Sequence, residues 1–150
     1  MKRIIYVFMT LMLMFGLCSC GESPNPQTKE NSPTSKIIYD SEIATVDFIK
    51  VSDSVLEGMF DIYLKVENKS AEKFTMYLND VSINGTMVEV GSGVPCDVLS
   101  GKNRTHDFFG KLENIGIASA SEIKEISFSI WLRDSSMNEI ETTEQLTIEL

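Results

Sequence analysis

The sequence predicts an all-β domain behind an N-terminal export signal, and three observations favour that fold. Apolar and polar residues alternate with a period of two in several segments, as expected where one face of a strand is buried. No segment of useful length has the period of an amphipathic helix. Turn-forming residues recur at intervals of about ten residues, which is typical of a two-sheet sandwich.

The N-terminus has the pattern of a secretory signal peptide. Lys2 and Arg3 supply two positive charges, and residues 4–17 carry no charge at all. This apolar run is shorter than the roughly 20 residues that a membrane-spanning helix needs. We therefore expect the protein to be exported rather than to be held by a transmembrane helix.

Two cysteines mark the end of this signal. Leu17, Cys18, Ser19 and Cys20 resemble the lipobox of bacterial lipoproteins, although Ala, Ser or Thr is more usual at the position of Cys18. The resemblance implies that residues 1–19 are removed, that Cys20 receives a diacylglycerol, and that the protein is anchored on the extracytoplasmic side of the cell membrane. The alternative is an ordinary signal peptide that is cleaved nearby, with Cys20 unmodified.

Residues 20–36 are predicted to form a disordered tether that begins with the lipidated cysteine. The segment contains three prolines and no large apolar residue, so it cannot bury enough surface to offset its ordering entropy. A flexible chain of this length spans roughly 20 Å, which allows the folded part to stand clear of the membrane.

The remaining residues, 37–150, are expected to form a single domain. The chain has 13 basic and 22 acidic residues, and loss of Lys2 and Arg3 with the signal leaves a net charge of −11 with the histidine neutral. Such an acidic balance repels phosphate, so we expect no nucleic-acid partner. After removal of Cys18 and acylation of Cys20, Cys96 has no partner for an intrachain disulfide, and we expect it to be a buried structural residue.

The first half of the domain shows three strand-like segments. Residues 43–51 alternate, and residues 58–70 place Phe60, Ile62, Leu64 and Val66 on one face. The third segment, residues 73–83, changes phase, because its apolar residues lie at even positions up to Leu78 and at odd positions afterwards. A β-bulge near residues 79–80 would return both halves to the same core face.

Asparagine marks several turns. Asn84 and Gly85 form the strongest local signal, because this pair suits the positive φ values of a tight type I′ hairpin turn. Asn68, Asn84 and Asn103 each also match a glycosylation sequence, and we interpret all three as turn residues.

The second half predicts further strands and a short helical cap. Residues 95–99 and 105–112 suit two short strands, and residues 111–119 suit a helical turn that ends at Gly116. Residues 123–133 form a strong strand pattern, and residues 139–150 close the domain. The core set on two of these strands is Phe60, Ile62, Leu64, Val66, Phe128, Ile130 and Leu132. We predict an immunoglobulin-like β-sandwich of about seven or eight strands with one short helical cap; a small closed barrel is the alternative.

The order of these elements carries a second resemblance. The segment from "VENKSAEKFTMYLNDVSINGTMVEV" to "IKEISFSIWLRDSS" and "TTEQLTIEL" is similar to uncharacterised domains in lipoproteins of Gram-positive gut and soil bacteria. The resemblance covers residues 58–150 and implies an immunoglobulin-like sandwich at the cell surface. It implies no activity and no catalytic residue.

No chemistry-bearing constellation stands out in the sequence. His106 is the only histidine, and we expect it at a surface or an edge rather than in a metal site or paired with Cys96 as a nucleophile. Acidic pairs such as Glu139 with Glu141 suit a solvated face, and Asp134 to Glu139 lacks the length and glycine of a calcium loop. We therefore expect no catalytic residues, no metal and no cofactor, and we expect that the protein is not an enzyme.

Three aromatic residues are the best candidates for a contact surface. Tyr63, Tyr77 and Trp131 all lie on the polar side of their predicted strands, so they would form one exposed face if those strands shared a sheet. We expect a binding module for a protein or a carbohydrate. The alternatives are a structural or accessory component of the cell envelope and, less favoured, an enzyme.

Overall fold

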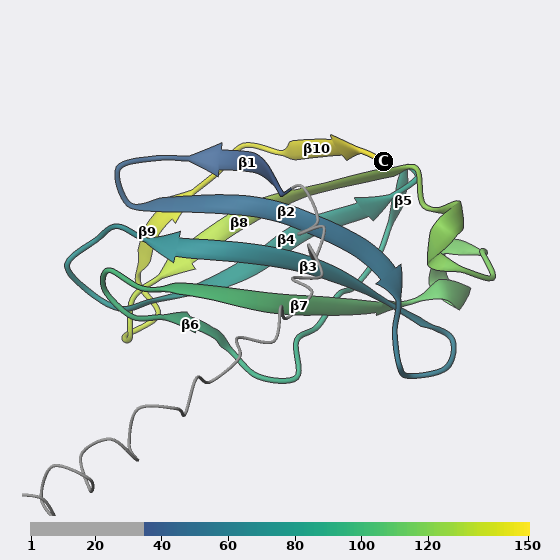
Figure 1. The fold of residues 1–150 in the computed structure, drawn as a ribbon, viewed down its shortest axis with the longest axis horizontal. Coiled ribbons are helices and arrows are strands. Elements are labelled where there is room, and N and C mark those ends of the chain that lie inside the picture. Colours follow the sequence, from purple (N-terminus) through teal and green to yellow (C-terminus); the bar gives the residue numbers. More distant parts are fainter. Residues whose placement is uncertain (1–34) are drawn as a thin grey trace, which may run out of the picture. The chain divides into compact units, whose positions relative to one another are not determined.

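The computed structural model describes residues 35–150, which form an immunoglobulin-like β-sandwich of two antiparallel sheets (Figure 1). Sheet A has the strand order β1-β2-β3-β7, and sheet B has the order β10-β8-β4-β5, with β6 also paired to β4 and β9 to β8. The strands are β1 Lys36–Asp40, β2 Ala44–Asp53, β3 Met59–Asn68, β4 Phe74–Ile83, β5 Thr86–Met87, β6 Cys96–Val98, β7 Asn103–Lys111, β8 Glu125–Arg133, β9 Glu139–Thr142 and β10 Leu146–Glu149. Two separate sheets make this a sandwich and not the closed barrel that we kept as the alternative.

The core lies between the inner faces of the two sheets, where the predicted alternation places it. All seven residues predicted for the core on β3 and β8 are fully or almost fully buried: Phe60, Ile62, Leu64, Val66, Phe128, Ile130 and Leu132. They form one cluster with apolar side chains of the neighbouring strands. Burial of a large aliphatic or aromatic side chain contributes about 1.5–3 kcal/mol, so this cluster is the main source of stability.

The predicted bulge in β4 is present. The register between β4 and β8 shifts between Asn79 and Ser82, and Asp80 adopts a positive φ of 52°. After the shift, Val81 and Ile83 point into the core, as Phe74 does before it. An extra residue in one strand rotates the chain that follows, which explains how one strand uses both even and odd positions for its core face.

The predicted hairpin after β4 is also present. Ile83 pairs with Thr86, which leaves Asn84 and Gly85 as a two-residue turn with φ values of 49° and 79°. Both residues therefore occupy the left-handed region that a type I′ turn requires.

The structure has more strands than predicted, and the additional ones are short. β1 begins at Lys36, one residue before the expected domain boundary, and pairs with β2. The register of β2 against β3 shifts between Phe48 and Lys50, so β2 contains a second irregularity that its simple alternation did not reveal. The described residues contain ten strands; β1 was not predicted, and the segment predicted at residues 139–150 is divided into β9 and β10.

The expected helical cap is present as two short 3-10 turns at one end of the sandwich (Figure 1). The first, η1 Leu112–Ile115, ends at Gly116 with a φ of 69°. The second, η2 Ala120–Glu122, follows Ser119, whose side chain and Glu122 form a reciprocal capping box. Asp53 at the end of β2 accepts hydrogen bonds from the backbone N–H of Ala120 at 2.7 Å and from the hydroxyl of Ser119 at 3.1 Å. These bonds fasten the cap to sheet A.

The chain between β5 and β6 connects the edges of the two sheets. Val88 donates its N–H to the carbonyl of Val81 on sheet B. Three residues later, Gly91 exchanges two backbone hydrogen bonds with Phe109 on β7 of sheet A. The chain then returns to sheet B at Cys96, which pairs with Met76.

Asn68 is a buried amide at the end of β3. Its Nδ2 donates to the carbonyl oxygens of Glu72 and Val98, both at 2.8 Å. Its Oδ1 accepts from the N–H of Ser70 at 2.8 Å and from the Ser70 hydroxyl at 2.7 Å. Asn68 forms the turn we predicted, and it also joins that turn to β6 in sheet B.

The predicted signal peptide, Cys20 and most of the predicted tether lie outside the described residues. Within residues 35–150, no helix is both long enough and apolar enough to span a bilayer.

Candidate functional site

The candidate site is on the outer face of sheet B, where two of the three predicted aromatic residues are cross-strand neighbours. Tyr77 on β4 and Trp131 on β8 are directly opposite each other in the register of the two central strands. Both side chains point away from the core and are half-buried. Side chains directly opposite each other on neighbouring strands have Cβ atoms about 4.5–5.5 Å apart, so Tyr77 and Trp131 share one patch of this outer face.

Tyr63 does not join this pair, which corrects the expectation of a single face with three rings. Tyr63 is on β3 in sheet A, whereas Tyr77 and Trp131 are in sheet B. The Nζ atom of Lys50 lies 4.8 Å from the centre of the Tyr63 ring, and the Tyr63 hydroxyl donates to Asp61 at 3.3 Å. Burial and the negative charge of Asp61 raise the pKa of Tyr63. The Tyr63 ring is therefore engaged by neighbours within sheet A.

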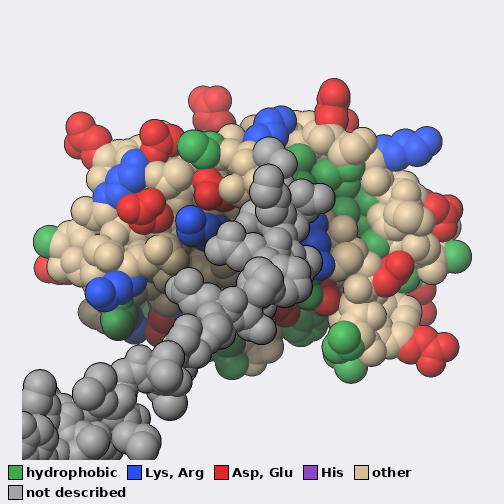
Figure 2. Space-filling model, in the orientation of Figure 1, with side chains coloured by type: hydrophobic (Ala, Val, Ile, Leu, Met, Phe, Trp, Pro, Cys, Tyr) green, Lys and Arg blue, Asp and Glu red, His purple; other side chains and the backbone are tan. Residues whose placement is uncertain are grey.

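The outer face of sheet A carries side chains of both charges. Figure 2, in which sheet A is toward the viewer, shows acidic and basic side chains intermixed over the described surface. The cross-strand partners Asp47 and Lys65 are an example of this mixture. Such a face favours solubility and does not form a field of one sign.

Arg133 organises one end of the aromatic pair. Its guanidinium carbon lies 4.7 Å from the centre of the Trp131 ring, a cation–π contact. Its Nη1 donates to the carbonyl of Met137 at 3.0 Å, and its Nη2 lies 3.9 Å from a carboxylate oxygen of Glu139. Arg133 thus covers one face of the Trp131 ring and connects it to the loop after β8.

That loop is held in a defined shape by Asp134. One carboxylate oxygen accepts from the backbone N–H groups of Ser136 at 2.8 Å and Asn138 at 2.9 Å, and the other accepts from the Asn138 side chain at 2.9 Å. The hydrogen bonds from Asn138, the side chain first, lower the pKa of Asp134. The carboxylate is consequently ionised at neutral pH and closes the loop.

Met137 is presented at the tip of this loop. It adopts a φ of 66°, which is unfavourable for a residue with a Cβ, and its side chain is 55% exposed. The Tyr77 hydroxyl donates to its sulfur at 3.6 Å. We call Tyr77, Trp131, Arg133 and Met137 the aromatic cluster. No sequence signal pointed to the last two, because their proximity depends on the pairing of β4 with β8.

Cys96 and His106, the two side chains considered for nucleophilic chemistry, are both buried. Cys96 is almost fully buried, and burial raises the pKa of its thiol to about 12, so it is protonated and unreactive at neutral pH. We expected His106 at a surface or an edge: it is on the edge strand β7, but it is only 4% exposed and is therefore not a surface residue. Burial lowers the pKa of His106, and its ring packs edge-on against Phe108 at 4.9 Å. Within residues 35–150, no three His, Cys, Asp or Glu side chains are grouped so as to hold a metal ion.

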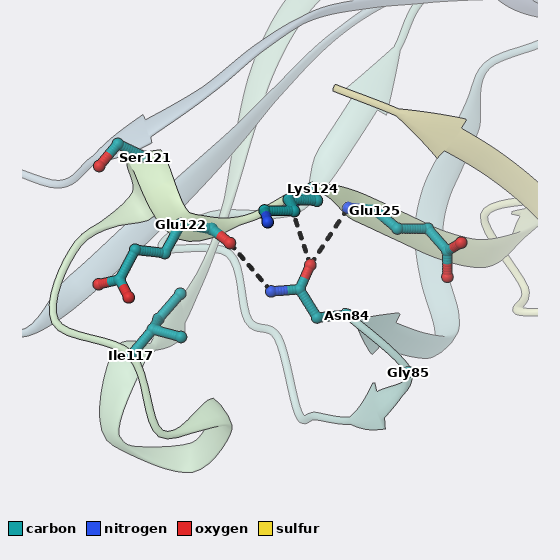
Figure 3. Close-up of a pocket in the computed structure, with 7 residues that line it drawn as sticks. All are labelled: Asn84, Gly85, Ile117, Ser121, Glu122, Lys124 and Glu125. Carbon is teal, nitrogen blue, oxygen red and sulfur yellow. Dashed lines mark hydrogen bonds between the residues drawn. The ribbon is translucent and has the colours of Figure 1, made fainter.

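A depression lies beside the hairpin turn, and Asn84 is one of the residues that line it (Figure 3). The Asn84 side chain donates to the carbonyl of Glu122 at 3.1 Å and accepts from the N–H groups of Lys124 at 2.8 Å and Glu125 at 3.2 Å. Figure 3 shows these three bonds converging on one amide. Because both the nitrogen and the oxygen of the amide fasten the hairpin to the start of β8, this side chain has a structural role.

Comparisons with known proteins show a likeness of fold alone. No protein-family model matches the chain, and no curated protein matches it. The structure is similar to the GAE domain of yeast GGA1, with a TM-score of 0.48, 14% identity, and coverage of 77% of this chain and 97% of that one. It is also similar to the GAE domain of GGA2p from Saccharomyces cerevisiae, with a TM-score of 0.47, 10% identity, and coverage of 77% and 96%. A FixG-related protein from Vibrio parahaemolyticus gives a TM-score of 0.37, 17% identity, and coverage of 73% and 100%.

Proposed function

We propose that this chain is a membrane-anchored extracytoplasmic lipoprotein whose β-sandwich binds a partner protein through the aromatic cluster. The observation that carries the proposal is the direct pairing of Tyr77 with Trp131 on the outer face of sheet B. The domain binds rather than catalyses, because Cys96 and His106, the residues best suited to nucleophilic or acid–base chemistry, are both buried.

The composition of the cluster favours a protein partner over a carbohydrate. Tyr, Trp, Met and Arg are the residue types enriched at protein interfaces, and all four are present. A sugar ring would stack on an open aromatic face, but Arg133 already covers one face of Trp131. Met137 adds a flexible apolar side chain that adapts to the shape of a protein surface.

The loop conformation also supports a binding role. A left-handed conformation costs a residue with a side chain about 1–2 kcal/mol, and glycine would remove most of that cost. Met137 nevertheless occupies this position and exposes more than half of its side chain. A strained backbone conformation at an exposed apolar residue supports a role for that side chain in contact with a partner rather than in the stability of the fold.

The test of binding is a comparison of variants in a pull-down from envelope extract, with thermal melting of each variant. Trp131→Ala should keep a melting temperature close to wild type and lose the partner, since truncation of an interface tryptophan typically costs about 2 kcal/mol or more. Tyr63→Ala, on the other sheet, is the matched control and should retain the partner.

A second variant separates binding from folding. Met137→Gly relieves the positive φ, so it should not lower the melting temperature, and it should still weaken capture. Unchanged capture by both Trp131→Ala and Met137→Gly would refute the proposal. A large loss of melting temperature in Trp131→Ala would make Trp131 a packing residue and would also count against it.

The anchor is tested by acyl labelling and detergent partition in a bacterial host. The support for it is the sequence at Leu17 to Cys20, which resembles a lipobox. Cys20→Ala should abolish the label and release the protein from membranes, because acyl chains supply the attachment. Cys18→Ala is the control and should keep both, as alanine is common at that lipobox position. A membrane fraction that is unchanged by Cys20→Ala would refute lipidation at this residue.

A further inference from the structure

The outer edge of β4, the edge opposite β8, is interrupted. β6 covers this edge from Phe74 to Met76, and β5 covers it at Ser82 and Ile83. Val88 adds one hydrogen bond to Val81. Within the described part of the chain, no strand pairs with this edge between Met76 and Val81, because residues 89–95 leave sheet B to reach Phe109 in sheet A. At 3.3 Å per residue, this β4 gap is about 16 Å long, enough for three or four residues of an extended peptide.

The backbone of Leu78 points into the β4 gap. The backbone N–H of Ile130 donates to the Thr143 hydroxyl, and the N–H of Thr143 donates to the Ile130 carbonyl. Both bonds lie on the side of β8 away from β4. Because backbone groups alternate between the two edges of a strand, the next residue along, Trp131, points toward β4 and bonds with Tyr77. Leu78, which follows Tyr77, therefore directs its N–H and C=O to the other edge, where no strand of the described residues receives them.

An apolar groove lies at the same place. Four apolar residues of β4 and of the chain after β5 line it, and its volume is about 390 Å³. They are Leu78, Val81, Val88 and Val90. Leu78 is on the inner face of β4 but remains partly exposed, unlike its core neighbour Met76. Met87, at the end of β5, borders the groove and is 62% exposed.

The charges around the groove have one sign. Asp80 and Glu89 line it and are both exposed, and no lysine or arginine lines it. Neither carboxylate belongs to an ion pair within residues 35–150. The Asp80 carboxylate accepts one hydrogen bond, from the side chain of Asn79 at 2.8 Å. The complementary ligand therefore carries positive charge beside an apolar group.

We propose that the β4 gap is a second binding surface, which receives a short, extended, basic peptide segment of a partner protein. The peptide backbone pairs with the N–H and C=O of Leu78, as in strand addition to a sheet edge. One apolar side chain lies against Val88 and Val90, and flanking lysine or arginine residues lie beside Asp80 and Glu89. This surface is distinct from the aromatic cluster, and the inference does not depend on that cluster.

The test uses the purified full chain in detergent micelles and two synthetic peptides. The basic probe is acetyl-Lys-Val-Lys-Val-Lys-amide, and the acidic probe is acetyl-Glu-Val-Glu-Val-Glu-amide. At millimolar concentration the basic probe should slow hydrogen exchange of the Leu78 amide by about tenfold or more, because that N–H becomes paired. The acidic probe should leave the exchange rate unchanged.

Charge variants test the specificity of the site. Asp80→Asn with Glu89→Gln should weaken binding of the basic probe about fivefold, and asparagine tolerates the positive φ at position 80. Glu57→Gln with Glu149→Gln removes the same charge from exposed positions outside the groove and should not alter binding. The proposal is overturned if Leu78 exchange does not respond to the basic probe or responds equally to both probes. Equal weakening by the two double variants would likewise reject it.

Discussion

Replacement of Asn68 by aspartate should produce a loss of stability that grows with pH. The substitution keeps the shape of the side chain and one acceptor oxygen for Ser70. The second oxygen replaces the amide nitrogen, which lies 2.8 Å from the carbonyl oxygens of Glu72 and Val98. Two donated hydrogen bonds are therefore exchanged for two contacts between acceptors, in a residue that is fully buried.

The magnitude follows from the protonation state of the new carboxyl group. In its protonated form this group would still donate to one of the two carbonyls, so we expect a cost of about 2 kcal/mol for the other lost bond and its unsatisfied partner. In its ionised form it would donate to neither and would bury a charge, so the cost should rise to about 4 kcal/mol. For a domain of this size, these values correspond to melting temperatures lower by about 8 °C and about 16 °C.

The pH dependence has a definite sign. The fold favours the protonated form, which raises the pKa of the new carboxyl group above its value in the unfolded chain. Stability is then lost as the pH rises from the range of an unfolded aspartate through the folded pKa. Thermal melting followed by circular dichroism should therefore show a larger deficit relative to wild type near pH 7 than near pH 4.

The control is Asn103→Asp, the same substitution at an exposed asparagine at the start of β7. It should change the melting temperature by about 2 °C or less at either pH. An equal deficit for Asn68→Asp at both pH values, or a deficit no larger than that of Asn103→Asp, would refute the assigned role of the amide.

Two further predictions concern buried positions. Gly110→Ala should lower the free energy of unfolding measured in urea by about 1–3 kcal/mol, because the new Cβ would lie 2.6 Å from the Phe60 ring. Gly93→Ala is the control and should be neutral, since a Cβ at that position has no atom within 4 Å. Equal effects of the two variants would contradict this account. Because burial lowers the pKa of His106 from its usual 6.5, the unfolded chain takes up the proton first, and stability should fall as the pH drops through that range. His106→Gln should flatten this dependence in melts between pH 5 and pH 8, and an unchanged slope would exclude His106 as its source.

Local patterns made much of the fold predictable. The shift from even to odd apolar positions in residues 73–83 identified the bulge, because only an extra residue returns both halves to one core face. Asn84 and Gly85 identified their turn, because few other pairs accept two positive φ values. Each of these signals lies within a few residues of the feature that it specifies.

The candidate site was less predictable, because it depends on pairing between distant segments. Alternation showed that Tyr63, Tyr77 and Trp131 point outward, but it did not show which sheet holds each strand. The burial of His106 has a different origin: it alternates with Phe108 on the inner face of β7 and lies opposite the core residue Leu64, a placement that its polar side chain did not suggest. The positive φ of Met137 had no signal in the sequence, since no glycine or asparagine occupies that position.

The strand order has a consequence for how the chain reaches its native state. β3 pairs with the edge strand β7 and β4 pairs with β8, so each sheet contains a strand pair that joins residues dozens of positions apart. Proteins dominated by such non-local pairs fold slowly, in milliseconds to seconds, because loop closure precedes the stabilising contacts. A nascent chain that has not yet reached Arg133 leaves Phe74 and Met76 uncovered and β4 without its main partner. An unpaired strand edge of this kind is prone to associate with other chains, so the pairing of β8 with β4 is the step that removes this exposure.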